Sequence, residues 1–120
     1  MSIGTLALSW LIAPVLFIVA GLLLIIKPPK NINDYYGYRT KGSKKTKIHW
    51  NLAQKIAGIY LLASGIILVI IAVLALLLIK EEYLFNPFLV FGIIIFELLQ
   101  FIIMIIIVEA KLKKIEIKEI

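Results

Sequence analysis

Three long apolar runs alternate with polar segments along this chain. The runs Ile3–Ile26 and Ile56–Ile79 contain no charged residue, and the run Leu84–Val108 contains only Glu97. Each run exceeds the ~20 apolar residues that a helix needs to cross the hydrocarbon core of a bilayer. Hydrophobic residues make up 62% of the 120 positions, and a soluble domain of this size has no core that could bury all three runs. The sequence therefore predicts an all-α fold, an integral membrane three-helix bundle that forms a single domain over residues 1–120.

Local chemistry sets the expected ends of the first and third helices. The prolines at 28 and 29 cannot donate backbone hydrogen bonds, so the first helix should end near Ile26. The first run is longer than the apolar region of a secretory signal and lacks a cleavage region, so we expect it to be retained. Asn86 is a favoured N-cap, and Pro87 fits the first position of a helix. These two residues predict a sharp start for the third helix.

The second helix is expected to begin ahead of its apolar part. Ser43 has the side chain of an N-cap, and neither Gly nor Pro follows it before the apolar run. Trp50 should then lie at the headgroup level, where amphipathic rings gather. Ala53, Ala57 and Ser64 are small residues that allow a neighbouring helix to approach closely.

The positive charges are distributed unevenly between the two sides that three crossings create. Of the 13 basic residues, eight lie in the loop 27–55, four in the tail 109–120 and one, Lys80, between the second and third runs. The positive-inside rule therefore predicts the N-terminus outside, with the loop and the C-terminus cytoplasmic. The net charge of +6 is explained by attraction to anionic lipid headgroups at that face, without nucleic acid as a partner.

The segment 31–42 combines polar residues with tyrosines at positions 35, 36 and 38. Gly37 permits a left-handed turn, and Arg39 supplies a planar donor group suited to phosphate or carboxylate. One interpretation is an interfacial anchor in which Arg39 meets lipid phosphate. The other is a binding surface for a protein partner, held in shape by the adjoining helix ends. The sequence alone leaves both open.

A longer motif includes this segment and continues into the second helix. It consists of Asn33, Asp34, Tyr35, Tyr36, Gly37, Tyr38, Arg39 and Thr40, followed by Ser43, Trp50, Ala53, Gln54 and Gly58. The pattern resembles the signature of the SdpI-like membrane immunity protein family over about residues 33–64.

The resemblance implies a function in resistance to a toxin. The founding member protects its producer from a secreted killing peptide and is also described as capturing a transcriptional repressor. We therefore expect a multi-pass protein of the bacterial cytoplasmic membrane that binds a peptide toxin within the bilayer or shields its target. The matching residues that become candidate binding residues are Asn33, Tyr36, Gly37, Tyr38, Arg39, Thr40, Ser43, Trp50 and Gln54.

Polar residues inside the spans form a second group of candidates, comprising Ser64, Glu97 and Gln100. A carboxyl group near the bilayer midplane is costly and tends to face a protein interior or a wet cavity. Gln100 and Met104 follow Glu97 at i+3 and i+7, so we expect this face to point into the bundle. A neutral Glu97 could donate a hydrogen bond to Ser64 or to the Trp10 carbonyl group, which Pro14 leaves free.

A midplane glutamate also suggests an alternative function, a small proton-coupled transporter of cationic or lipophilic compounds. Small multidrug exporters use such a carboxylate, but they usually have four spans with the glutamate in the first. This chain has three expected spans, with Glu97 in the last.

An enzymatic function, a metal site and a cofactor are not expected. The chain has no cysteine and a single histidine, His49, which we interpret as interfacial. The tail is expected to continue the third helix, with Leu112, Ile115 and Ile117 on the membrane surface. The small residues and the polar face would equally allow a homo-oligomer.

Overall fold

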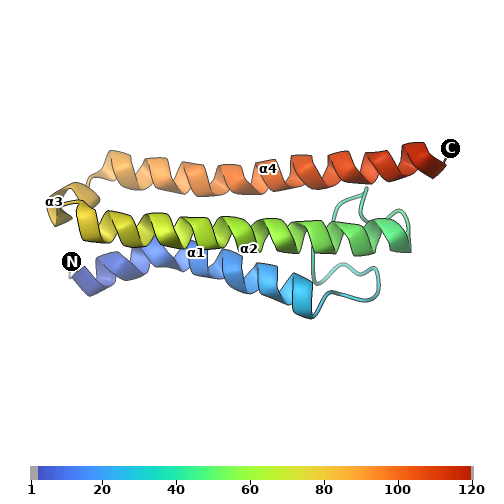
Figure 1. The fold of residues 1–120 in the computed structure, drawn as a ribbon, viewed down its shortest axis with the longest axis horizontal. Coiled ribbons are helices and arrows are strands. Elements are labelled where there is room, and N and C mark those ends of the chain that lie inside the picture. Colours follow the sequence, from blue (N-terminus) through green and yellow to red (C-terminus); the bar gives the residue numbers. More distant parts are fainter. Residues whose placement is uncertain (1–2, 120) are drawn as a thin grey trace.

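The computed structural model describes residues 3–119, which form three long helices and one short helix (Figure 1). In chain order these are α1 (Ile3–Ile26), α2 (Lys47–Leu78), α3 (Glu81–Leu84) and α4 (Pro87–Glu119). By length and composition, α1, α2 and α4 can each cross a membrane. The structure thus confirms the predicted all-α fold with three candidate spans, and α3 is an element that the sequence pattern did not predict.

Helix α2 lies between α1 and α4 along an elongated bundle, whose extents are 57 × 24 × 21 Å (Figure 1). The loop that joins α1 to α2 lies at the same end as the C-terminal end of α4, whereas α3 and the start of α1 lie at the other end. The bundle is longer than the ~30 Å hydrocarbon core of a bilayer. The bundle is therefore long enough for the loop and the end of α4 to extend beyond the apolar layer together.

Helices α1 and α2 approach each other through glycines. A Cβ atom added to Gly21 would lie 2.5 Å from the backbone nitrogen of Leu62, and one added to Gly65 would lie 2.8 Å from a side-chain carbon of Ile18. Backbones this close are typical of membrane helices packed through small residues. The predicted small residues Ala53 and Ala57 are also buried. The glycines make the tightest contact, which the sequence analysis did not identify.

Helix α4 is joined to the other two over only part of its length. The Phe101 ring meets the Phe17 ring of α1 edge to face, with centroids 4.8 Å apart. Met104, Val108 and Leu112 are buried farther along, but no side chain from residue 87 to residue 103 is. Most of the surface of the first half of α4 therefore faces the surroundings of the bundle, although Ile93 packs against Trp10, Ala72 and Leu84.

The observed helix starts confirm one prediction and correct another. The Asn86 side-chain oxygen accepts a hydrogen bond from the backbone of Phe88 at 2.9 Å, as expected for the N-cap of α4. The expected N-cap Ser43 is wrong, because α2 begins later and Thr46 caps it by accepting from the backbone of His49 at 3.1 Å. The connecting loop therefore spans residues 27–46.

The tail after residue 108 continues α4, as expected, but its apolar residues do not lie on a membrane surface. Leu112 is only 2% exposed, and it belongs to the same buried cluster as Tyr38 of the loop and Ala53 of α2. Ile115 packs against this cluster. The expected membrane-surface placement of these two residues is wrong because the loop and α2 cover them, and the Ile117 side chain lies outside the described residues.

Candidate functional site

The loop 27–46 is attached to the start of α2 by a buried tryptophan. The indole nitrogen of Trp50 donates to the backbone carbonyl group of Pro29 at 2.7 Å, and the side chain is 0% exposed. Trp50 is therefore enclosed by protein, and its expected place at the headgroup level stays a prediction. Its bond places the beginning of the loop against α2.

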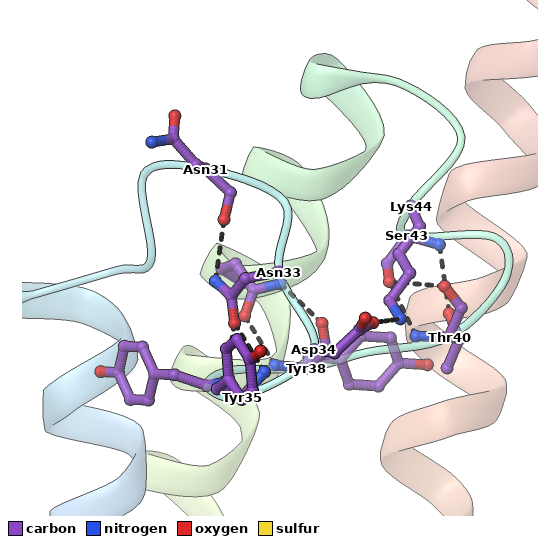
Figure 2. Close-up of polar contacts among 10 residues, drawn as sticks. Asn31, Asn33, Asp34, Tyr35, Tyr38, Thr40, Ser43 and Lys44 are labelled. Carbon is purple, nitrogen blue, oxygen red and sulfur yellow. Dashed lines mark hydrogen bonds and ion pairs between the residues drawn. The ribbon is translucent and has the colours of Figure 1, made fainter.

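Asn33 organises the first turn of the motif (Figure 2). Its side-chain oxygen accepts hydrogen bonds from the backbone nitrogens of Tyr35 and Tyr36, each at 2.8 Å, and its amide nitrogen donates to the Asn31 carbonyl group. Such side-chain bonds to the local backbone stabilise a turn. The Tyr36 hydroxyl group then donates to the carbonyl group of Lys27 at 2.9 Å, which connects the turn to the end of α1.

Gln54 of α2 holds the centre of the motif through two buried hydrogen bonds. Its side-chain oxygen accepts from the Tyr38 backbone nitrogen, and its side-chain nitrogen donates to the Tyr38 carbonyl group, both at 2.7 Å. Gly37 has a φ of 101°, and a Cβ atom there would lie 2.5 Å from the Gln54 oxygen. The close pairing therefore requires glycine at this position, both for the backbone angle and for the space.

Thr40 and Ser43 close the next turn by reciprocal hydrogen bonds (Figure 2). The Ser43 hydroxyl oxygen accepts from the Thr40 backbone nitrogen at 2.8 Å and donates to the Thr40 carbonyl group at 2.9 Å, and the Thr40 hydroxyl group accepts from the Ser43 backbone nitrogen. Beside this turn, the ammonium group of Lys44 pairs with the carboxylate of Asp34, which lowers the pKa of Asp34 from its ordinary value. Ser43 thus has a role in the loop instead of in capping a helix.

The end of α4 is attached to the loop and to the start of α2. The Tyr38 ring points toward α4 in Figure 2, and its hydroxyl group donates to Glu109 at 3.0 Å. Burial, and then the bond to Glu109, raise the pKa of Tyr38, so its hydroxyl group remains a donor. Farther along α4, Glu116 forms an ion pair with Lys45 and lies 3.6 Å from the Nε2 atom of His49.

His49 is buried, which corrects its interpretation as an interfacial histidine. Its Nδ1 atom lies 2.6 Å from the Thr46 hydroxyl oxygen, and its Nε2 atom has no hydrogen-bond partner within the described chain. The side chain lies beside the end of α4, where its Nε2 atom is near Glu116. Within residues 3–119, no group of three histidine or carboxylate side chains could hold a metal ion.

Arg39 differs from the other candidate residues of the loop. Its side chain is exposed, and within residues 3–119 it forms neither a hydrogen bond nor an ion pair, although it lies near enough to Asp34 to act on that carboxylate. Together with Tyr36, Tyr38 and Thr40 it lines a cavity of about 410 Å³ between the loop and the three long helices. The structure therefore brings the predicted loop residues together, and it leaves one guanidinium group available to a ligand.

Only some of the polar residues inside the spans form hydrogen bonds to another helix. Gln100 accepts a hydrogen bond from the Tyr60 hydroxyl group of α2 at 2.7 Å, a partner that the sequence analysis missed. Ser64 donates to the carbonyl group of Leu61 in its own helix. In the described part of the chain Glu97 is half-exposed and has no hydrogen-bond partner, so the expected bonds to Ser64 or the Trp10 carbonyl group do not form.

Comparisons with known proteins match the region that forms this site. The model of the SdpI/YfhL protein family matches residues 30–109, which include the loop, α2 and most of α4. A protein of Bacillus subtilis (strain 168), described as "Uncharacterized protein YfhL", is 40% identical over 53 residues. These residues are 44% of this chain and 48% of that relative, so the match covers about half of each protein. No solved structure matches the chain. The match extends beyond the motif region 33–64, and the chain belongs to the SdpI/YfhL family.

Proposed function

We propose that this protein protects a bacterial cell from a membrane-active peptide toxin, and that it does so in the cytoplasmic membrane by binding the peptide within the bilayer or by shielding its target. Membership of the SdpI/YfhL family supports the proposal, because toxin immunity is the role that the resemblance to the founding member implies. The function is binding, and it requires no catalytic group.

One observation carries the proposal, namely the uncovered first half of α4. No side chain between residues 87 and 103 is buried, and large apolar residues such as Phe91 are exposed there. The segment between α2 and α4 lies on the side that the positive-inside rule predicts to be outside. It is short, so it offers little surface to a peptide that is still in water. A peptide that has entered the bilayer would instead meet an apolar helix face without a partner from this chain.

Survival of toxin-sensitive cells tests the proposal. Expression of the intact chain should protect them from the peptide against which the founding family member acts. Replacing Phe91, Ile95 and Leu98 together with alanine should abolish protection, since these exposed residues share one face of α4. The matched control replaces Leu8, Ile12 and Val15, which have the same spacing and are exposed on α1, and it should protect fully.

Killing by every related peptide that is unchanged by the intact chain would contradict the immunity function. Equal loss of protection in the α4 variant and in the α1 control would contradict the assignment of binding to α4. The amount of each variant in the membrane must be measured by immunoblot, so that a loss of protein is not mistaken for a loss of binding.

The second candidate function is proton-coupled transport of cationic or lipophilic compounds, and Glu97 favours it. This carboxyl group lies inside a span and, within the described residues, has no hydrogen-bond partner, so it is free to exchange a proton. Transport predicts proton-driven uptake of an aromatic cation into vesicles that is abolished by Glu97→Gln. Immunity without transport predicts no such uptake by the intact chain or by the Glu97→Gln variant.

A further inference from the structure

A groove runs along the bundle from the loop toward the middle of the membrane. The cavity beneath Arg39 is continued by a second cavity of about 450 Å³, whose lining consists of apolar residues of α1, α2 and α4. The two cavities share Ala20, Leu23, Leu61 and Phe101 in their walls. They therefore form one groove, with α1 and α4 as its sides and α2 as its floor.

The length of this groove corresponds to one leaflet of a bilayer. Along α1 its lining extends from Ala13 in the second cavity to Leu24 beneath the loop. At ~1.5 Å per residue this distance is about 16 Å, and half of a ~30 Å hydrocarbon core is about 15 Å. The groove thus reaches from the level of the headgroups to about the midplane, which suits an acyl chain and is far longer than a small ion requires.

The charges at the loop end of the groove favour an anion. The Asp34 carboxylate within the motif and the Glu109 carboxylate beside it are already engaged, Asp34 by Lys44 and Glu109 by the Tyr38 hydroxyl group. The Arg39 guanidinium group has no such partner among the described residues, and it lines the groove at its polar end. A guanidinium group presents several N–H donors in one plane, a geometry that matches the oxygens of a phosphate.

We propose that this groove is a binding site for one anionic phospholipid of the leaflet on the loop side, with its phosphate at Arg39 and an acyl chain along α1 and α4. The inference goes beyond the proposed function, because it concerns the groove between α1 and α4, whose lining does not include the exposed face of Phe91, Ile95 and Leu98. An anionic lipid would fit this groove because the groove combines three features. It has apolar walls, it is about as long as one leaflet, and it has a cation without a partner at one end.

Native mass spectrometry of the purified full-length chain in detergent tests the site. Phosphatidylglycerol should bind about tenfold more tightly than phosphatidylcholine with the same acyl chains, a difference of about 1.4 kcal/mol. Arg39→Gln should remove this preference by weakening phosphatidylglycerol binding about tenfold, since hydrogen bonds between charged groups are lost. Arg39 is exposed, so this variant should fold, and its unfolding temperature confirms that it does.

Two further variants separate the site from general attraction to the loop. Lys41→Gln removes an exposed charge of the same loop that does not line the groove, and it should leave phosphatidylglycerol binding unchanged. Ala20→Leu places a larger side chain in the wall shared by both cavities, and it should weaken binding as Arg39→Gln does.

Three results would overturn the proposal. Equal weakening by Lys41→Gln and Arg39→Gln would mean that only the summed charge of the loop attracts lipid. Unchanged binding in Ala20→Leu would place the lipid outside the groove. Competition by inorganic phosphate as effective as competition by phosphatidylglycerol would make the ligand a free anion, not a lipid.

Discussion

At the scale of single residues, the motif side chains act chiefly on one another and on the loop backbone. Gln54 and Trp50 each bond to buried backbone groups that would otherwise be without partners, and Asn33 bonds to the backbone of an exposed turn. Unpaired polar groups are costly away from water, so each of these bonds restricts the conformations of the loop. Their combined effect is to hold Arg39, which bonds to none of them, at a fixed place.

The pairing of Gln54 with Tyr38 gives a test of this role. Gln54→Ala should lower the free energy of unfolding by about 1–3 kcal/mol, because it leaves the backbone N–H and carbonyl groups of Tyr38 buried without partners. Thermal unfolding in detergent and amide hydrogen exchange of residues 33–42 measure the effect. Asn51→Ala, an exposed change on the same helix, is the control. Equal exchange in both variants would show that Gln54 does not hold the loop.

The sequence predicted which residues gather at this site, but not how they are bonded. The spacing of the motif identified Tyr38, Trp50 and Gln54 as a group, and all three meet at the loop. Their partners include Pro29 and the backbone of Tyr38, and a backbone group carries no signature in a sequence. The partner of Trp50 was not predicted for the same reason, since an amphipathic ring suits a headgroup layer and a buried carbonyl partner equally well.

At the scale of elements, the close contact of α1 with α2 depends on backbone atoms that cannot move aside. Gly21→Ala would place a Cβ atom 2.5 Å from the Leu62 backbone nitrogen, so the helices must separate and the unfolding temperature should fall clearly. Gly92→Ala is a matched control, because a Cβ atom there meets nothing within 4 Å. Its higher helix propensity should add up to about 1 kcal/mol. Equal unfolding temperatures for the two variants would contradict this packing.

The attachment of the α4 tail should depend on pH. Glu116 of this tail bonds with Lys45, and this bond holds the pKa of Glu116 below its ordinary value of 4.5. The folded state therefore favours the charged carboxylate. The resulting stabilisation is complete above pH 4.5 and is lost as the pH falls through the lowered pKa. The part of the tail beyond the buried Leu112 should therefore detach from the start of α2 in acid, and only below about pH 4.5.

Spin labels can measure this detachment directly, because the chain has no native cysteine. Labels at the exposed positions Asn51 and Lys113 should give a narrow distance distribution at pH 7 that broadens below pH 4.5. In the Glu116→Gln variant the distance distribution should be broad already at pH 7 and should change little on acidification. A distribution of the intact tail that stays narrow in acid would show that the ion pair does not hold it.

The sequence predicted where the helices lie along the chain better than it predicted what their side chains contact. Apolar runs and prolines were sufficient to predict α1 and the start of α4, because few other structures accommodate such runs. The start of α2 was misplaced because Ser43 and Thr46 are both suitable N-caps, and the choice depends on the turn that Ser43 forms with Thr40. Leu112 was misplaced because an amphipathic helix end has the same pattern whether its apolar side meets lipid or protein.

At the scale of the whole molecule, the polar contacts concentrate at one end of an otherwise apolar bundle. The loop, the start of α2 and the end of α4 form a single structured cap there, whereas the other end contains the short α3, whose Leu84 packs with Trp10 and Ala72. The proposed lipid groove opens beneath this cap. The side of the membrane that the cap faces therefore decides two things. It decides which leaflet supplies the lipid to the groove, and it decides from which side a toxin meets α4.

The orientation follows from charge and can be tested with single cysteines. The loop and the tail contain twelve of the 13 basic residues, so the positive-inside rule predicts a cytoplasmic cap and an external α3. Cysteines in place of the exposed residues Lys41 and Glu82 report on the two ends. A membrane-impermeant maleimide should label position 82 in intact cells, and position 41 only after permeabilisation, which serves as the control for reactivity. Labelling of position 41 in intact cells would reverse the orientation and place the lipid groove in the outer leaflet.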